Sequence, residues 1–447
     1  MAIVGKLDAE LKMIADNSGA ERFRQAATRG RVAVRARQPV PDQPCADCLH
    51  EPPPTGRARP AIASRAAFWL VAFVLTVTML GTTLPTPLYV IYQAQWHFSS
   101  AIVTVTFAVY AAAVLATLLL AGRSSDQAGR KLVLAIALAL SALSTVVFIL
   151  APDVEVLIVA RIVSGLSAGL MTGTATAALT ELVPASASRR ASLVATAANM
   201  AGLGLGPLIA GLFAQYAPHP TTLVFEVYLA VLAAASLCLL RVPETVSPRC
   251  RPALRFAGLG VPEQGRGEFA AAAVAGFAAF ALLGLFSALA PTFLGSVLHE
   301  ESHAVQGAVV FVMLAVGSVT QIVAFRFGSR RVVLAGLGLF LAALALIAAA
   351  LSQASLALFL AGTVTGGVAV GAIFLGSLAT ANRLAPPGRR SHVVSTYFAA
   401  CYCGLIIPVI GVGVASQFIS DFAAVLAFSI LLAALSLFAF AGIRRSL

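Results

Sequence analysis

The sequence predicts an all-α integral membrane protein with twelve transmembrane helices in two pseudo-symmetric halves of six helices each. Three observations predict this class: the composition, the length of the apolar runs and the placement of basic residues. Of the 447 residues, 59% are hydrophobic and 11% are charged, whereas soluble domains have about 25% charged residues. The apolar residues gather in twelve runs, each close to the roughly 20 residues that a helix needs to cross a bilayer.

The apolar runs are continuous, unlike the alternating segments of about 10 residues that form transmembrane barrels. The predicted spans cover residues 67–92, 101–121, 132–151, 155–180, 192–216, 221–240, 269–296, 304–325, 332–351, 355–380, 392–417 and 422–443. We expect a disordered basic tail over 1–64, a first six-helix bundle over 65–245, a cytosolic linker over 246–267 and a second bundle over 268–447.

Basic residues lie on alternate loops only. Of the 30 Lys and Arg residues, 29 lie on one side of the predicted spans, and the thirtieth, Arg161, lies inside a span. Because cytoplasmic loops are enriched in Lys and Arg, this pattern places both termini in the cytosol. The net charge of +12 then forms a rim beside anionic lipid headgroups, and we expect no nucleic-acid partner. Only three of the 30 are Lys, which suggests a GC-rich bacterial genome and hence a bacterial plasma (inner) membrane.

The N-terminal tail, residues 1–64, is polar, charged and rich in proline, which predicts disorder. It lacks the apolar segment that a secretory signal peptide contains. Cys45 and Cys48, with His50 nearby, form an isolated pair without a second pair at zinc-like spacing. We therefore interpret the pair as incidental and expect no metal site.

The first span is unusually polar in its second half. Pro85 and Pro87 predict a bent or discontinuous helix there. Because binding pockets place a few polar groups among apolar walls, its polar side chains are candidates to line a pathway. The candidate pathway residues are Tyr89, Tyr92, Gln93, Tyr110, Asn199, Gln321, Tyr397 and Tyr402.

The loop after the second span carries the most specific motif. Asp126 lies where a carboxylate stabilises a helix N-terminus, and Arg130 can hold that carboxylate. The loop resembles the signature loop of the major facilitator superfamily, with Gln127 where the family often has a basic residue. The resemblance implies the major facilitator fold and a latch on the cytosolic face in one access state. The latch residues would be Gly122, Asp126, Gly129, Arg130 and Lys131, with Glu181 at the end of span four. The alternative is an ordinary loop that only sets topology.

Span four places Arg161 about 8 Å below the outer surface, at 1.5 Å per residue. A charged side chain at that depth either faces a cavity or snorkels to the surface, and we favour the cavity. With Gly165 and Gly169, Arg161 resembles the next signature of the same superfamily. The two glycines would let neighbouring helices approach closely.

Span five contains a glycine ladder ending in proline. Gly202, Gly206, Pro207 and Gly211 resemble the Gly-Pro signature of the superfamily's proton-driven exporters, with Ala210 in place of one glycine. Pro207 predicts the bend of a gate helix. The alternative is a generic kinked span, because Pro408 occupies the corresponding place in the second half. After span six, the segment from Val242 to Thr245 also resembles the family's exit from its first half.

Glu226 is the one acid well inside a predicted span. It is either the proton carrier, because burial favours the protonated form, or a structural residue at headgroup level. The sequence has no Walker-type phosphate-binding loop, which argues against transport driven by ATP hydrolysis.

These observations predict a secondary active transporter, a proton-coupled exporter of a small amphipathic drug or metabolite that works by rocking alternating access. The alternatives are a nutrient importer or uniporter of the same fold, or a non-transporting membrane sensor. An enzyme is not expected, because the spans contain no cluster of His, Asp, Glu or Ser with base partners. We expect no cofactor. The expected partners are a small-molecule solute, a proton or another coupling ion, and the lipid bilayer, with the protein itself a monomer.

Overall fold

The computed structural model describes residues 61–445 except for 122–123, 247–257 and 387–388. These residues belong to one compact unit, Arg57–Leu447. The predicted tail with Cys45 and Cys48, the latch candidate Gly122 and part of the predicted linker lie outside the described residues.

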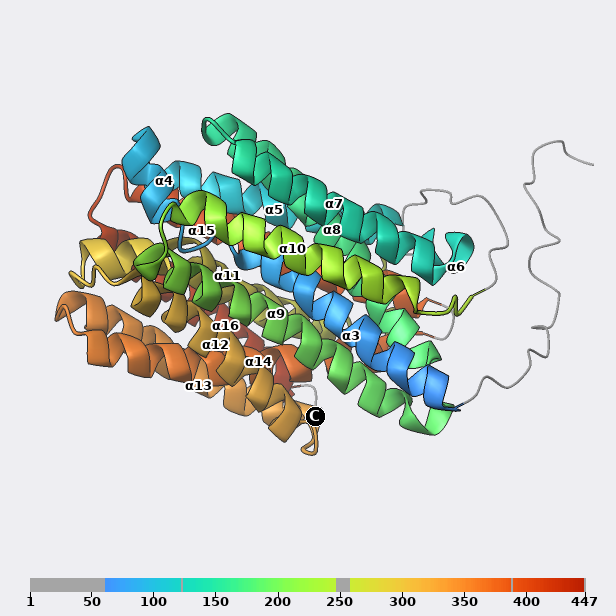
Figure 1. Ribbon diagram of the computed structural model, residues 1–447. Coiled ribbons are helices and arrows are strands. Elements are labelled where there is room, and N and C mark those ends of the chain that lie inside the picture. Colours follow the sequence, from blue (N-terminus) through green and yellow to red (C-terminus); the bar gives the residue numbers. More distant parts are fainter. Residues whose placement is uncertain (1–60, 122–123, 247–257, 387–388, 446–447) are drawn as a thin grey trace, which may run out of the picture. The chain divides into compact units, whose positions relative to one another are not determined.

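Every regular element in the described residues is a helix (Figure 1). The first half contains α3 (Ala61–Thr83), α4 (Tyr89–Trp96), α5 (Ser100–Ala121), α6 (Ser124–Ala128), α7 (Arg130–Leu150), α8 (Val154–Glu181), α9 (Ser188–Tyr216) and α10 (Pro220–Leu240). The second half contains α11 (Arg266–Ser296), α12 (His303–Ala324), α13 (Ser329–Ser352), α14 (Leu356–Leu384), α15 (Arg390–Ala415) and α16 (Asp421–Arg445). Among the described residues, twelve helices are long and apolar enough to cross a membrane, which confirms the predicted number.

The first predicted span is interrupted, as its two prolines predict. α3 ends at Thr83 and α4 begins at Tyr89. Between them, Pro85 and Pro87 have no N–H to donate, so a regular helix cannot continue. The chain instead makes turns in which the N–H of Thr86 donates to the carbonyl of Thr83 at 3.0 Å.

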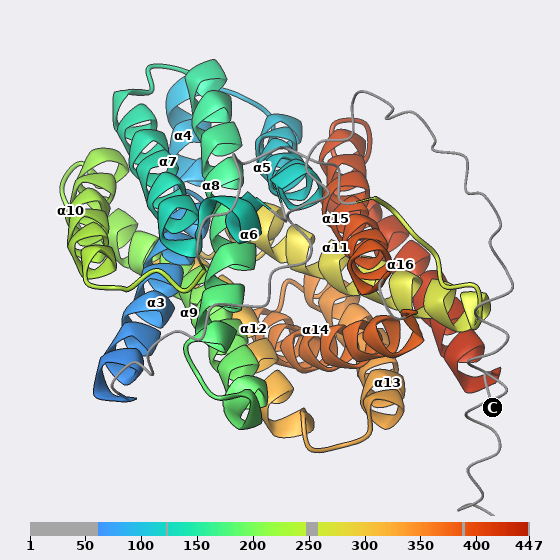
Figure 2. The same cartoon turned by 90° about the vertical axis from the view of Figure 1, so that its right-hand side faces the viewer.

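The two halves repeat the same helix pairs. In the first half α3 packs on α9, α5 on α8, and α7 on α8; in the second half α11 packs on α15, α12 on α14, and α13 on α14. In Figure 2 the first half, coloured blue to green, and the second half, coloured yellow to red, gather on different sides. The predicted two-half architecture is therefore confirmed, and it is typical of transporters built from repeats.

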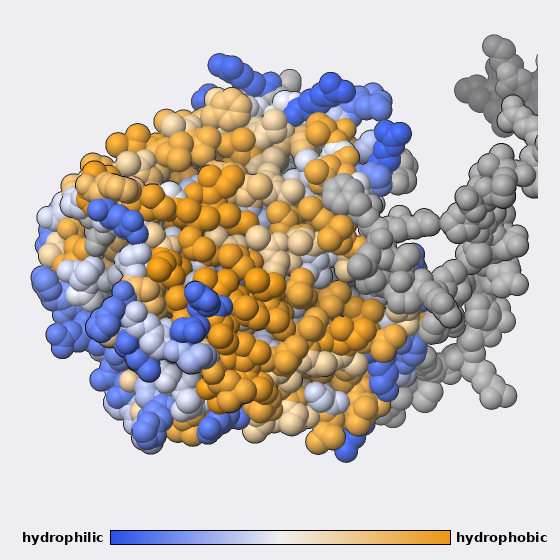
Figure 3. Space-filling view, turned by 90° about the horizontal axis from the view of Figure 1, so that it is seen from above, coloured by the Kyte–Doolittle hydropathy of each residue, from blue (hydrophilic) through white to orange (hydrophobic). Residues whose placement is uncertain are grey.

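The surface carries a broad apolar belt between hydrophilic ends (Figure 3). Large apolar side chains are exposed on many helices, for example Leu150 at 70%, Leu240 at 68% and Ile430 at 63%. A soluble protein rarely exposes such a continuous apolar surface. With twelve apolar helices, the belt defines a multi-pass membrane protein.

One end of the helices, which we call the basic end, carries the helix-terminal arginines. These arginines include Arg130, Arg190, Arg330, Arg383 and Arg390. We call the opposite end, where α5 and α12 begin and α9 and α15 end, the sealed end.

The two halves meet along α9 with α12 and along α5 with α15. These helices cross tightly towards the sealed end. A Cβ added at Gly307 would lie 2.2 Å from the carbonyl oxygen of Pro207, and one added at Gly413 would lie 2.3 Å from the Oγ1 of Thr104. An added Cβ would clash with backbone at Gly307 and with the Thr104 side chain at Gly413, so glycine permits the close approach at both crossings.

Two hydrogen bonds join the halves at the sealed end. The N–H of His303 donates to the Oε1 of Gln215 at 3.0 Å, and the Nε2 of Gln417 donates to the Oγ of Ser99 at 2.9 Å. Together with the glycine crossings, they hold the halves in contact there.

Candidate functional site

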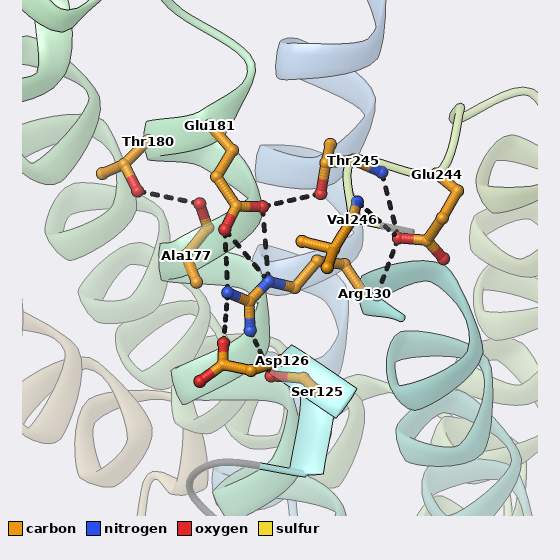
Figure 4. Close-up of polar contacts among 9 residues, drawn as sticks. All are labelled: Ser125, Asp126, Arg130, Ala177, Thr180, Glu181, Glu244, Thr245 and Val246. Atoms are coloured by element: carbon orange, nitrogen blue, oxygen red, sulfur yellow. Dashed lines mark hydrogen bonds and ion pairs between the residues drawn. The ribbon is translucent and has the colours of Figure 1, made fainter. Parts of the chain in front are cut away.

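Arg130, the first residue of α7, is the centre of an ion network at the basic end (Figure 4). Its Nη2 lies 2.5 Å from the Oδ1 of Asp126 on α6 and 2.8 Å from the Oε1 of Glu181 at the end of α8. Its Nη1 donates to the Oγ of Ser125 at 2.5 Å. The Arg130 side chain is only 9% exposed, so three helix ends converge on one nearly buried guanidinium.

The chain that follows α10 completes this network. The Oγ1 of Thr245 donates to the Oε2 of Glu181 at 2.7 Å. The carboxylate of Glu244 accepts the N–H groups of Arg130 at 2.8 Å and Lys131 at 3.0 Å. A carboxylate there satisfies free N–H groups and complements the helix dipole, so Glu244 caps α7 from a distant part of the sequence.

Lys131 points to the end of another helix. Its Nζ donates to the carbonyl of Leu240, the last residue of α10, at 2.7 Å. Cations stabilise helix C-termini because the last carbonyls there lack helical partners. Glu244 and Thr245 were not predicted as members of this network. The sequence feature that pointed to them was the Pro-Glu-Thr segment after span six. This segment alone does not show which helix the glutamate side chain contacts.

The residues of this network all belong to the first half. α6, α7, α8 and the segment after α10 contribute the contacts described above. The network thus stabilises the basic end of one half in this structure. Its predicted role as a latch between access states stays a prediction.

We expect Gly129→Ala to destabilise the first half by about 1–3 kcal/mol, the cost of a disfavoured backbone conformation. Gly129 has φ +98°, and an added Cβ would lie 2.7 Å from the Oε2 of Glu244. Thermal unfolding of the purified variant measures the loss. The matched control is Gly173→Ala, because a Cβ there has no atom within 4 Å. Equal Tm values for the two variants would contradict the expectation.

A cavity of about 300 Å³ lies between the two halves. Side chains of α3, α5, α8 and α9 line it from the first half, and side chains of α11, α12, α14 and α15 line it from the second. A second cavity of about 350 Å³ shares Thr196, Phe374 and Leu378 with the first and reaches Asn382 and Arg390 near the basic end. The pathway therefore runs from the centre towards the basic end.

The two walls of the central cavity differ in chemistry. The first half contributes hydroxyl and amide groups from Thr83, Thr172, Thr176, Thr196 and Asn199. The second half contributes the aromatic side chains of Phe280, Phe374, Phe398 and Tyr402. The aromatic rings contact one another, since the ring centroid of Phe280 lies 5.6 Å from that of Phe374 and 5.9 Å from that of Tyr402. The first half also contributes the rings of Phe107 and Tyr110. The cavity thus combines aromatic rings from both halves with polar groups that come mainly from the first half.

The structure places the predicted pathway residues in different environments. Tyr110, Asn199 and Tyr402 line the central cavity, and Gln321 lines the adjoining one. Tyr397 does not line either, because its hydroxyl is buried 2.7 Å from the Oγ of Ser377 inside the second half.

Three further predicted pathway residues lie on α4, namely Tyr89, Tyr92 and Gln93, and none lines the central cavity. The reason is the break at Pro85 and Pro87, after which α4 starts as a separate helix. These three side chains therefore lie outside the central cavity, and their predicted role in the pathway stays a prediction. The aromatic residues of the second half were missed, because phenylalanine in a span gives no signal that separates a cavity wall from a lipid contact.

Glu226 lines neither cavity, which favours its interpretation as a structural residue, and its role as proton carrier stays a prediction. Its side chain is exposed on α10, whereas Tyr228 is buried, with its hydroxyl donating to the carbonyl of Val77 at 3.1 Å. Residues two apart on a helix point in nearly opposite directions. Because α10 packs on α3 and α7 through the Tyr228 face, Glu226 faces outward.

We therefore expect Glu226→Gln to leave the pH profile of transport unchanged, because an exposed carboxyl outside the cavity does not need to carry a proton. Initial rates of solute flux in proteoliposomes across pH 5–9 measure this. Glu155→Gln, which removes another exposed acid, is the matched control. Loss of pH dependence in the Glu226 variant alone would return the coupling role to Glu226.

Arg161 is completely buried in the first half, which rules out snorkelling. Its Nη1 donates to the carbonyl of Thr82 at 2.6 Å. Its Cζ lies 4.7 Å from the ring centroid of Tyr110 and 6.0 Å from that of Phe107. Both rings line the central cavity, so Arg161 lies directly behind the cavity wall.

The predicted packing glycines lie at helix crossings. An added Cβ would lie 2.5 Å from the carbonyl oxygen of Tyr110 at Gly165, and 2.6 Å from the Cβ of Thr117 at Gly169. On α9, Gly202 and Gly206 face α3 in the same way, and Gly211 faces α12. α9 and α15 continue as helices through Pro207 and Pro408.

Two six-helix halves around a central cavity define a polytopic helical membrane protein of the transporter type. A sequence model of the Major Facilitator Superfamily matches residues 71–325, more than half of the chain, and the chain belongs to that family. The family and its fold are those of transporters and not of enzymes, as the sequence predicts.

Two curated relatives come from Bacillus subtilis (strain 168). The chain is 30% identical to the uncharacterized MFS-type transporter YceJ over 184 residues, which cover 41% of this chain and 45% of that protein. It is 27% identical to Multidrug resistance protein 1 over 170 residues, which cover 38% of this chain and 44% of that protein. The matched regions thus span less than half of each relative.

The fold is also that of a solved transporter structure. The crystal structure of a bacterial homolog to the human lysosomal transporter Spinster, in an inward-facing and occupied conformation, has a TM-score of 0.68. It shares 15% sequence identity, and the match covers 87% of this chain and 98% of that one.

Proposed function

We propose that this protein is a secondary active transporter that exports a small amphipathic drug or metabolite across the bacterial plasma membrane in exchange for protons. The observation that carries the proposal is the central cavity, which is built from both halves and continues towards one end only. Such a cavity between two repeats is the geometry that alternating access requires.

The basic end is the cytosolic end in this proposal, because basic residues are enriched on cytoplasmic loops. Both termini then lie in the cytosol, and the structure corresponds to an inward-open state. The outward-open state would form when the halves rock apart at the sealed end and close at the basic end. The network around Arg130 would act as the latch of the basic end during this exchange.

The cavity chemistry supports an amphipathic solute. Its volume of about 300 Å³ lies at the lower end of the range for small-molecule sites, and its lining combines aromatic rings from both halves with hydroxyl and amide groups. Export is favoured over import by the Gly-Pro segment around Pro207 and by the similarity to Multidrug resistance protein 1. The protein would act as a monomer.

The test is transport in proteoliposomes with an imposed proton gradient. Lumenal pH is recorded while amphipathic drugs and neutral metabolites are added in turn. Solute-evoked proton flux is expected. The direction of the proton movement distinguishes exchange from cotransport, and hence export from import. Flux of labelled solute without proton movement would identify a uniporter. Absence of both solute and proton flux across the panel would overturn the proposal and favour a membrane sensor.

A further inference from the structure

The guanidinium of Arg161 is a fully buried cation without an acidic partner in the described part of the chain. Its exposed fraction is 0%, and the ion pairs found among the described residues all involve other arginines. Its surroundings are the carbonyl of Thr82 and the rings of Tyr89, Phe107 and Tyr110, whose centroids lie 4.7–6.0 Å from Cζ. A buried charge without a counter-charge is strongly unfavourable in a low-dielectric interior.

Several hydrogen-bond donors in and around this cation have no acceptor within the described ranges. Among the described residues, the Nε and Nη2 of Arg161 have no hydrogen-bond partner, and neither does the hydroxyl of Tyr89. The rings attract the positive charge through their faces, but they leave these N–H groups without acceptors. Guanidinium and phenol hydroxyl groups can both donate, so the cluster offers hydrogen bonds and positive charge to an acceptor that the described part of the chain does not supply.

The cluster lies one side chain away from the central cavity. Tyr110 lines the cavity with one part of its ring and lies 4.7 Å from the Cζ of Arg161. On α3, Thr83 lines the cavity, and its neighbour Thr82 binds Arg161 through its carbonyl. A displacement of the Tyr110 side chain would therefore connect Arg161 with the cavity.

We propose that Arg161 is the binding site for a monovalent anion, either the carboxylate of an amphipathic solute held in the central cavity or a chloride ion. The solute arm of this inference rests on the proposed transport function. One positive charge among aromatic rings neutralises one negative charge and leaves a second one unpaired, so a dianion is excluded. The guanidinium fork suits a carboxylate, which accepts two parallel hydrogen bonds. The aromatic wall of the second half would then hold the apolar body of the solute.

The test is equilibrium binding to the purified full-length protein in detergent. The probes are radiolabelled benzoate and radiolabelled chloride, each titrated against gluconate at constant ionic strength. We expect saturable binding to the wild type, with affinity lowered about tenfold or more in Arg161→Gln, because a hydrogen-bonded charge pair is lost. Arg161→Lys, which keeps the charge without the fork, is expected to bind more weakly than the wild type and more strongly than Arg161→Gln. Arg330→Gln is the control for loss of a cation at the basic end.

The outcomes separate the sources of the anion. Saturable benzoate binding that depends on Arg161 supports a solute carboxylate, and chloride binding without benzoate binding supports a resident counterion. Absence of saturable binding of either probe to the wild type overturns the inference, even if Arg161→Gln fails to fold. Undiminished binding to a folded Arg161→Gln also overturns it. Because binding is measured without a gradient or vesicles, a failure of the transport assay does not affect the binding result. Conversely, a finding that the protein transports only cations does not affect the proposed transport function.

Discussion

Replacing Arg130 by glutamine is expected to lower the transport rate tenfold or more, which corresponds to a change of about 1.4 kcal/mol or more in free energy. The guanidinium separates the carboxylates of Asp126 and Glu181, which lie 2.5 and 2.8 Å from its Nη2. Without it, two negative charges face each other beside the buried Ser125. The joint between α6, α7 and α8 is then expected to loosen.

The stability loss should be smaller than that of a fully buried pair. The side chains of Asp126 and Glu181 are 54% and 32% exposed, so water screens part of the repulsion. We expect a loss of roughly 1.5–3 kcal/mol, the range for hydrogen bonds to charged groups. Asp126→Asn should cause a smaller loss, since Arg130 keeps Glu181. Tm in detergent and flux in proteoliposomes measure both variants.

The control for Arg130→Gln is Arg330→Gln at the start of α13. Arg330 also lies at a helix start of the basic end, but its Nη2 donates to the carbonyls of Ile443 and Arg444, both at 3.0 Å. Its loss removes hydrogen bonds to neutral groups only. Normal transport by Arg130→Gln at normal expression would remove the latch assignment.

Replacing Gly307 by valine is expected to open the sealed end. The added Cβ would lie 2.2 Å from the carbonyl oxygen of Pro207, and the Cα of Gly211 is 3.1 Å away. Both obstacles are backbone, so α9 and α12 must separate. Overpacking of this kind costs about 1–3 kcal/mol, which shifts a two-state population roughly 5- to 150-fold.

Spin labels measure this opening. In a background in which the six cysteines are replaced, labels at Glu155→Cys and Gln353→Cys report the distance between the halves at the sealed end. We expect a longer distance and reduced transport in Gly307→Val. The matched control is Gly411→Val on α15, where an added Cβ meets no atom within 4 Å. An unchanged distance in a folded Gly307→Val would contradict the assignment of this crossing as a gate.

Much of the fold could be predicted because it depends on local chemistry. Hydrophobicity over about 20 residues decides whether a segment enters a bilayer, and the twelve predicted runs correspond to the twelve long helices. The break between α3 and α4 follows from Pro85 and Pro87, which act on their own backbone. The contact of Arg130 with Asp126 is also local, because only three residues separate the two in the chain, at the junction of α6 and α7.

The sequence could not show which way a side chain points. In a soluble helix, apolar periodicity marks the buried face, but a helix in a membrane is apolar all round. Nothing in the pattern of α10 therefore distinguishes the outward face of Glu226 from the inward face of Tyr228. The same lack of signal hid the aromatic wall formed by Phe280, Phe374 and Phe398, and it placed Tyr397 in a cavity that it does not line.

The sequence by itself determined the class of protein, the number of spans, the halves and the basic end, because each follows from hydropathy, charge and repeats along the chain. The tertiary structure alone decided that Glu244 caps α7 from 113 residues away, that the halves touch at Gly307 and Gly413, and that Arg161 lies behind Tyr110 without an acidic partner among the described residues. These contacts join segments far apart in the chain. Their geometry depends on how whole helices pack, which no local pattern encodes.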